Sequence, residues 1–126
     1  MARVLVIDDD AVMRDMMRLY LEQGGFEVVE AGDGMDGVRR YRQRPPDVVI
    51  VDIFMPRKDG IETIIDLRGL DPAAHILAIS GGGEIGGMEY LSYAKVLGAD
   101  RVLCKPFRRE ELISAVRETA AEHGAA

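Results

Sequence analysis

Four short apolar runs, each followed directly by a polar side chain, are the feature of this sequence that most constrains its fold. Runs of this length are typical of strands that are buried on both faces of a parallel sheet. The carboxyl ends of parallel strands share one edge of the sheet, and open α/β sheets bind ligands at that edge. The runs are 3–7 before Asp8 and Asp9, 47–51 before Asp52, 76–79 before Ser80, and 101–104 before Lys105. The sequence therefore predicts a site of three carboxylates, one hydroxyl and one ammonium.

Helical periodicity alternates with these runs. A helix capped by Asp10 is expected to end at Gly24, a further strand to cover 26–31, and a second helix to cover 35–43 before Pro45. The side chains expected to face the core are Val12, Met16, Leu19 and Tyr20 on the first helix, and Val38 and Tyr41 on the second.

Three more helices are expected: one beginning near Asp59 and Gly60, one ending at Gly98, and one after the last apolar run. Their expected inward side chains are Ile61, Ile64 and Ile65, then Met88, Leu91, Ala94 and Leu97, then Leu112, Ile113 and Val116. Five βα units in one chain predict an α/β fold, a flavodoxin-like (βα)5 doubly wound parallel sheet of order 2-1-3-4-5. In that order the ends of the first and third strands, with Asp8, Asp9 and Asp52, lie at the switch point.

Composition limits the class of protein. A chain of 126 residues is expected to form one domain, and its net charge of −6 argues against nucleic acid or an anionic membrane as partners. No apolar run approaches the roughly 20 residues of a membrane span, and the first strand leaves no room for a signal peptide. The single cysteine, Cys104, is consistent with a reducing compartment. A cytoplasmic protein is therefore expected.

The polar groups at the strand ends suit phosphoryl transfer. Three carboxylates at one point repel one another, and an oxygen-only site without Cys or His favours Mg²⁺ as the cation that relieves the repulsion. Beside the metal, the Lys105 ammonium would neutralise charge on a phosphoryl group and Ser80 would donate a hydrogen bond to it. One carboxylate would act as the nucleophile.

The chain resembles the CheY-like receiver domains of two-component response regulators from Val4 to about Glu118. The matching motifs are Val-Ile-Asp-Asp at 6–9, Val-Asp-Ile-Phe-Met-Pro at 51–56 with Asp59-Gly60, Ile-Ser at 79–80, and Gly-Ala-Asp at 98–100 leading into Lys105-Pro106-Phe107. The resemblance implies a stand-alone receiver over 1–122, a short tail at 123–126 and no output domain.

The resemblance also implies a role for each site residue. Asp52 would accept a phosphoryl group from a sensor histidine kinase or a histidine phosphotransfer protein. Asp9, Asp52 and the main-chain carbonyl of Phe54 would bind Mg²⁺ directly, with Asp8 acting on the metal through water. Ser80 would be the switch hydroxyl and Lys105 the ion-pairing lysine, joined to Pro106 by a cis peptide bond.

A receiver is a signalling protein rather than an enzyme, although slow self-dephosphorylation is expected. The resemblance places contact with a downstream protein on the face formed by the fourth helix, the fifth strand and the fifth helix. Its residues in this chain would be Tyr90, Tyr93, Arg101 and Arg108.

Two positions depart from the family pattern. Val102 occupies a position where receivers usually carry Tyr or Phe, whose ring follows the switch hydroxyl. The loop 81–87 is unusually rich in glycine. The loop is either a plain flexible connection or a segment that rearranges around a phosphorylated Asp52, and the sequence leaves both interpretations open.

Three other functions compete with the receiver interpretation. Gly81, Gly83 and Gly86 match the dinucleotide-binding motif, but they follow the fourth strand instead of the first, and Lys105 stands where that motif needs an acidic residue. A magnesium phosphatase would need a second carboxylate two residues after its nucleophile. That position is held by Asp10 or Phe54, depending on the nucleophile, and neither choice supplies the whole set of groups. A pseudo-receiver, which keeps the fold for protein contact without the chemistry, is favoured only by Val102.

Overall fold

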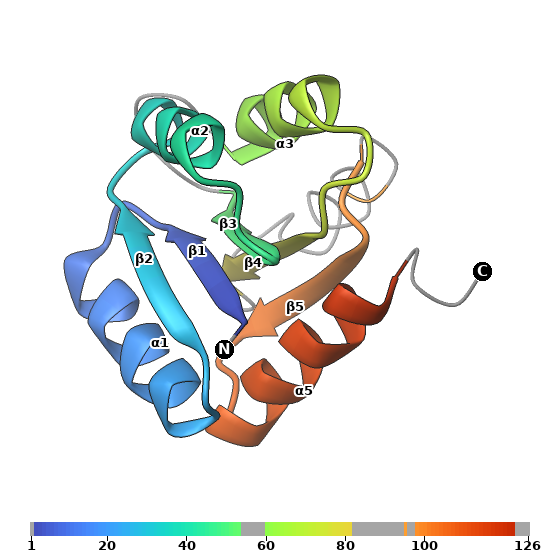
Figure 1. Ribbon diagram of the computed structural model, residues 1–126. Coiled ribbons are helices and arrows are strands. Elements are labelled where there is room, and N and C mark those ends of the chain that lie inside the picture. Colours follow the sequence, from blue (N-terminus) through green and yellow to red (C-terminus); the bar gives the residue numbers. More distant parts are fainter. Residues whose placement is uncertain (1, 54–59, 82–94, 96–97, 123–126) are drawn as a thin grey trace.

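The computed structural model describes residues 2–53, 60–81, 95 and 98–122, and its sheet confirms the predicted topology. All neighbouring strands are parallel, in the order β2-β1-β3-β4-β5 (Figure 1). The strands are β1 (Arg3–Ile7), β2 (Glu27–Ala31), β3 (Val48–Asp52), β4 (Ile76–Gly81) and β5 (Arg101–Lys105).

Helices cover both faces of the sheet. Helices α2 and α3 lie on one face, and α1 and α5 lie on the other (Figure 1). The bounds are α1 (Ala11–Gln23), α2 (Gly34–Gln43), α3 (Gly60–Leu70) and α5 (Arg109–Ala121). The helix expected before Gly98 lies, apart from residue 95, outside the described residues, as does the glycine-rich segment 82–87. None of the described helices is both long enough and apolar enough to cross a membrane.

Each face of the sheet has its own apolar cluster, because successive strand side chains point to opposite faces. The cluster under α2 and α3 contains Ile7, Val51, Tyr41, Ile64 and Leu67 among others. The cluster under α1 and α5 contains Val6, Ile50, Met17, Leu21, Leu112 and Val116 among others. The predicted inward positions of α2 agree with these clusters, because Tyr41 is buried and Val38 is partly buried against the first cluster. On α5 the prediction was correct for Leu112 and Val116, which are buried, whereas Ile113 is partly buried beside Gly24 and belongs to neither cluster.

The predicted inward face of α1 was correct in part. Met16 and Tyr20 are partly buried against the cluster under α1 and α5, but the prediction was wrong for Val12 and Leu19. Val12 and Leu19 are 77% and 55% exposed, whereas Met17 and Leu21 are fully buried. The helix carries two neighbouring apolar rows, and hydrophobic spacing alone does not decide which of them faces the sheet. The predicted N-cap is confirmed, because the Asp10 carboxylate accepts the main-chain N–H groups of Val12 and Met13.

The prediction for α3 was correct for Ile64, which is fully buried, and for Ile61, which packs partly buried against the core. It was wrong for Ile65, which is 47% exposed. Adjacent isoleucines lie about 100° apart on a helix, so only one of Ile64 and Ile65 can point directly at the sheet. The polar Thr63 is buried in preference to Ile65.

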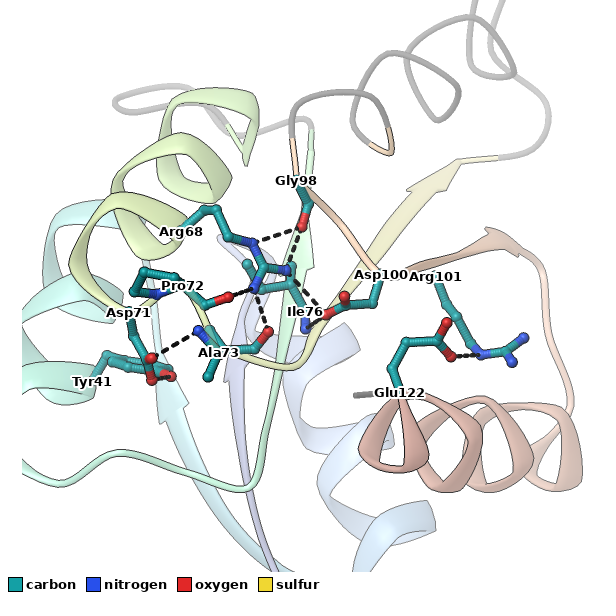
Figure 2. Close-up of polar contacts among 11 residues, drawn as sticks. Tyr41, Arg68, Asp71, Pro72, Ala73, Ile76, Gly98, Asp100, Arg101 and Glu122 are labelled. Atoms are coloured by element: carbon teal, nitrogen blue, oxygen red, sulfur yellow. Dashed lines mark hydrogen bonds and ion pairs between the residues drawn. The ribbon is translucent and has the colours of Figure 1, made fainter. Parts of the chain in front are cut away.

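Arg68 links the segments that precede β4 and β5 at the amino edge of the sheet (Figure 2). Its guanidinium extends from α3 and donates to the carbonyls of Pro72, Ala74 and Gly98 at 2.8, 2.7 and 2.5 Å, and it pairs with Asp100 at 3.1 Å. The same Asp100 carboxylate accepts the N–H of Ile76 at 2.7 Å. One side chain thus fixes the segments that lead into β4 and β5, which sets the positions of their opposite, carboxyl ends.

Gly60 allows α3 to begin directly against the end of β3. A Cβ atom at this position would lie 2.3 Å from the carbonyl oxygen of Asp52 and 2.2 Å from the Cα of Ile53. Both are main-chain atoms that cannot turn aside. Any side chain at position 60 would therefore displace the strand end that carries Asp52.

The structure predicts opposite effects for two Gly→Ala substitutions in α3. Gly60→Ala should lower the free energy of unfolding by about 1–3 kcal/mol because the added methyl group overlaps the β3 backbone. Gly69→Ala, in the last turn, meets nothing within 4 Å and should raise it by about 0.5 kcal/mol through the better helix propensity of alanine. Urea denaturation of both variants measures the two effects. A Gly60→Ala protein as stable as Gly69→Ala would contradict the close approach.

The buried Tyr41 of α2 donates a hydrogen bond of 2.7 Å to Asp71, which follows α3 (Figure 2). Burial and then this bond raise the pKa of Tyr41 well above its usual range. The Tyr41 hydroxyl, together with the N–H of Ala73, lowers the pKa of Asp71 below its usual value. Because this pKa is lower in the folded protein, the bond stabilises the fold above the unfolded pKa, and its contribution is lost as pH falls through the folded pKa.

Tyr41→Phe should therefore lower the free energy of unfolding by about 1 kcal/mol at neutral pH. The difference from the wild type should begin to shrink below about pH 4, the ordinary pKa of an unfolded Asp carboxyl, and should go on shrinking as pH falls through the lower pKa of folded Asp71. Urea denaturation across pH 3–7 gives the measurement. Tyr20→Phe is the matched control, because the partly buried Tyr20 makes no hydrogen bond through its hydroxyl to a described residue, and it should show no such pH dependence. If Tyr41→Phe lowered the free energy of unfolding by the same amount across this pH range, the ionised Asp71 carboxylate would be excluded as the source of the loss.

Candidate functional site

Strand alternation brings the charged groups of three strands to one face of the sheet. Val6, Ile50 and Leu103 all contact the cluster under α1 and α5. Asp8, Asp52 and Lys105 each follow one of these residues by two positions, so they point to that same face at the carboxyl edge. The convergence is a consequence of parallel register, in which Ile7 pairs with Val51 and Asp52 pairs with Ile79.

The three carboxylates lie close together with one ammonium between two of them. Oxygen atoms of Asp8, Asp9 and Asp52 lie within 4.8 Å of one another. Lys105 Nζ lies 3.5 Å from Asp8 Oδ2 and 3.6 Å from Asp52 Oδ2. Asp8 and Asp52 are 0% and 5% exposed, whereas Asp9 is exposed to solvent. The formal charge of the group is thus −2, and water reaches it from the side of Asp9.

Ser80 lies in β4 at the same edge. It is fully buried, and its Oγ makes no hydrogen bond within the described part of the chain. It pairs with Cys104, the residue before Lys105. Ser80 lies two positions after Ala78, which belongs to the cluster under α2 and α3. Its side chain therefore points to the face of the sheet opposite to that of Asp8, Asp52 and Lys105.

Arg14 is a site neighbour that the sequence reasoning missed. It lies on α1 and donates from Nη1 to the main-chain carbonyl of Asp8 at 2.6 Å. Its Nε donates to Glu30 of β2 at 3.2 Å. Its position in the sequence could have indicated this role. Arg14 lies one helical turn after the Asp10 N-cap, and a long side chain at this position points back toward the start of the helix.

The remaining predicted site features divide into one that is observed and one that is not described. The Lys105–Pro106 peptide bond is cis, as the family resemblance implies. Phe54, whose carbonyl was expected to bind the metal, lies outside the described residues.

The donor set fits Mg²⁺. The three groups offer only oxygen atoms, which is the preference of a small hard cation. Asp8 Oδ2 is buried and makes no hydrogen bond with the described residues, its near neighbour being the Lys105 ammonium. A buried carboxylate oxygen without hydrogen bonds is costly unless a cation is near it. The arrangement is therefore compatible with a divalent cation beside the buried carboxylates of Asp8 and Asp52.

The face expected to contact a downstream protein is described in part. Arg101 makes an ion pair of 3.0 Å with Glu118 of α5 and one of 3.2 Å with Glu122, which directly follows that helix. The main-chain N–H of Arg108 donates to Glu111 at 2.8 Å and lowers the pKa of that carboxyl. A hollow of about 510 Å³ lies between β5 and α5, lined by Lys95, Arg101, Val102, Leu103, Glu110, Glu111, Ser114, Ala115 and Glu118. Tyr90 and Tyr93 lie outside the described residues.

Comparison with known proteins gives relatives that match most of the chain. The family model for the response regulator receiver domain matches residues 4–117. The chemotaxis protein CheY of Halobacterium salinarum is 36% identical over 117 residues, which cover 92% of this chain and 94% of that protein. The CheY of Bacillus subtilis is also 36% identical, covering 93% of this chain and 96% of its own length.

Solved structures agree with this result. A response regulator receiver domain protein from Clostridium thermocellum superposes with a TM-score of 0.89 at 26% identity, covering 98% of both chains. The chemotaxis protein CheY4 of Vibrio cholerae superposes with a TM-score of 0.85 at 30% identity, covering 94% of this chain and 98% of that one. With the convergent strand ends and the family match along 4–117, the chain belongs to the CheY-like response regulator receiver domains of two-component signalling.

Proposed function

We propose that Asp52 accepts a phosphoryl group from a phosphohistidine of a sensor histidine kinase or a histidine phosphotransfer protein, in a Mg²⁺-dependent reaction. The observation that carries the proposal is the position of Asp52 at the end of β3, within reach of both Lys105 and the carboxylates of Asp8 and Asp9. Of the three carboxylates, Asp52 is the one in the central strand of the sheet, where β1 and β4 flank it with charged and hydroxyl groups.

In this reaction an Asp52 carboxylate oxygen forms a bond to phosphorus as the bond from phosphorus to the donor imidazole nitrogen breaks. The imidazole leaves as a neutral ring after taking up a proton. Mg²⁺, held by Asp9, Asp52 and the Phe54 carbonyl with Asp8 acting through water, would supply positive charge opposite the phosphoryl oxygens. Lys105 would bind one of these oxygens, for which it must turn from Asp52, and Ser80 would donate its hydroxyl to another. Slow attack by water entering past Asp9 would reverse the modification.

Receiver domains of this type are signalling proteins, and we propose that this one passes its signal by protein contact or phosphoryl relay on the face of the fourth helix, β5 and α5. Val102 on β5 is 38% exposed and carries no ring to follow Ser80, so we expect the segment after β4 to transmit the change. We place this exchange in the cytoplasm, where the thiol of Cys104 stays reduced. The alternative is a pseudo-receiver that is never phosphorylated.

Acetyl phosphate and Mg²⁺ test the acceptor. Intact mass should show one added phosphoryl group on the wild type that hydroxylamine removes, as expected of an acyl phosphate. Asp52→Asn should show none because an amide oxygen is a poor nucleophile. Asp47→Asn is the matched control, since Asp47 precedes the same strand at its opposite end, and it should be labelled like the wild type. Labelling of Asp52→Asn would refute the assignment, and an unlabelled wild type would favour the pseudo-receiver.

Thermal denaturation with and without Mg²⁺ tests the metal. The cation should raise the melting temperature of the wild type because it binds only the folded protein. Asp9→Ala should remove most of this rise and should stabilise the metal-free protein by up to about 1 kcal/mol, since one repelling carboxylate is gone. Asp15→Ala, an exposed carboxylate on α1 outside the cluster, should keep the full Mg²⁺ response. An Asp9→Ala protein that is less stable without metal and responds fully to Mg²⁺ would show that the cluster is structural.

A further inference from the structure

The β1–α1 connection carries two of the three clustered carboxylates, and its main chain is held by few bonds. The N–H of Asp8 donates to the carbonyl of Ala31 at 3.1 Å, and the N–H of Asp10 donates to the side chain of Asp8 at 2.9 Å. The carbonyl of Asp8 belongs to the peptide group that joins Asp8 to Asp9. The orientation of that peptide group therefore sets where the Asp9 carboxylate points relative to Asp8.

Arg14 holds this peptide group. Its Nη1 donates to the Asp8 carbonyl at 2.6 Å, the shortest contact in the connection. The guanidinium is itself fixed, because its Nε donates to Glu30 Oε1 at 3.2 Å. The other Glu30 oxygen accepts from Arg18 Nε at 2.5 Å. Arg14 and Arg18 thus share Glu30 as a partner, and of the two only Arg14 contacts the Asp8 carbonyl.

We propose that Arg14 is a positioning residue for Mg²⁺, which acts by locking the Asp8–Asp9 peptide group so that the Asp9 carboxylate faces Asp8 and Asp52. This inference rests on the proposed function only in requiring that the cluster binds Mg²⁺. Because Asp9 is exposed, it has little packing of its own to fix it. Partners that orient metal ligands from behind are worth about 10–100-fold in metal affinity.

The charge of Arg14 makes the inference testable. A charge effect and a positioning effect predict opposite changes in Mg²⁺ affinity when Arg14 is removed. A guanidinium 2.6 Å from the Asp8 carbonyl repels a cation bound at the cluster. If Arg14 acted only through its charge, its removal would tighten Mg²⁺ binding. If Arg14 positions the peptide group, its removal weakens binding in spite of the lost repulsion.

The experiment measures the Mg²⁺ dissociation constant of the purified protein by isothermal titration calorimetry, in parallel with thermal denaturation. Arg14→Met should weaken Mg²⁺ binding by about 10-fold. Arg18→Met is the matched control: it loses the same Glu30 partner and a positive charge, so it should share any loss of stability but should bind Mg²⁺ within about 2-fold of the wild type. Arg14→Lys keeps the charge and one donor group, and should recover part of the affinity through a bond to the Asp8 carbonyl.

Unchanged or tighter Mg²⁺ binding by Arg14→Met would overturn the inference, as would equal weakening in Arg14→Met and Arg18→Met. Should Arg14→Met fail to fold, Arg14→Lys decides, because it keeps the charge but not the geometry of the guanidinium. Mg²⁺ affinity more than about 2-fold below that of the wild type, together with an unaltered Arg18→Met, supports positioning, and affinity within about 2-fold of the wild type or above it overturns the inference. A wild type that does not bind Mg²⁺ at all would instead refute the magnesium part of the proposed function. The two failures are therefore distinguishable.

Discussion

This site depends on the ion pairs that the Lys105 ammonium makes with the carboxylates of Asp8 and Asp52. Two buried carboxylates and a third exposed one would repel one another strongly without a cation. Lys105 offsets part of this repulsion and leaves the group with a net negative charge, which is compatible with a divalent cation. In the proposed reaction the same ammonium would bind an oxygen of a phosphoryl group on Asp52. Lys105 thus lowers the cost of bringing the carboxylates together and leaves the negative charge that the proposed Mg²⁺ site requires.

The parallel register of the strands brings the charged groups of the site together at one edge of the sheet. Contacts away from the site stabilise this register. Gly60 lets α3 start against the main chain of Asp52. Arg68 and Asp100 fix the amino ends of β4 and β5, whose other ends carry Ser80 and Lys105. Substitutions at these positions should therefore affect the chemistry through the position of strand ends, although none of them contacts a carboxylate of the cluster.

The sequence predicted the sheet order and the convergence of Asp8, Asp9, Asp52 and Lys105, because apolar runs and their polar ends are local patterns that parallel pairing turns into one edge. It did not predict the rotation of α1, where Val12 is exposed and Met17 buried, since two adjacent apolar rows have nearly the same periodicity. The role of Arg14 was not foreseen for a related reason. Its contacts to Asp8 and Glu30 depend on the packing of α1 beside β2, which no local pattern encodes.

The most direct test of the electrostatic account is Lys105→Met, studied without metal and in a Mg²⁺ titration. Methionine keeps the length and packing of the side chain and removes the charge. The metal-free variant should have a lower melting temperature than the wild type, because the repulsion between Asp8 and Asp52 is no longer offset. The variant should also bind Mg²⁺ more tightly than the wild type and should therefore show a larger rise in melting temperature when the metal is added. Unchanged metal-free stability together with unchanged or weaker Mg²⁺ binding would show that Lys105 does not balance the carboxylates.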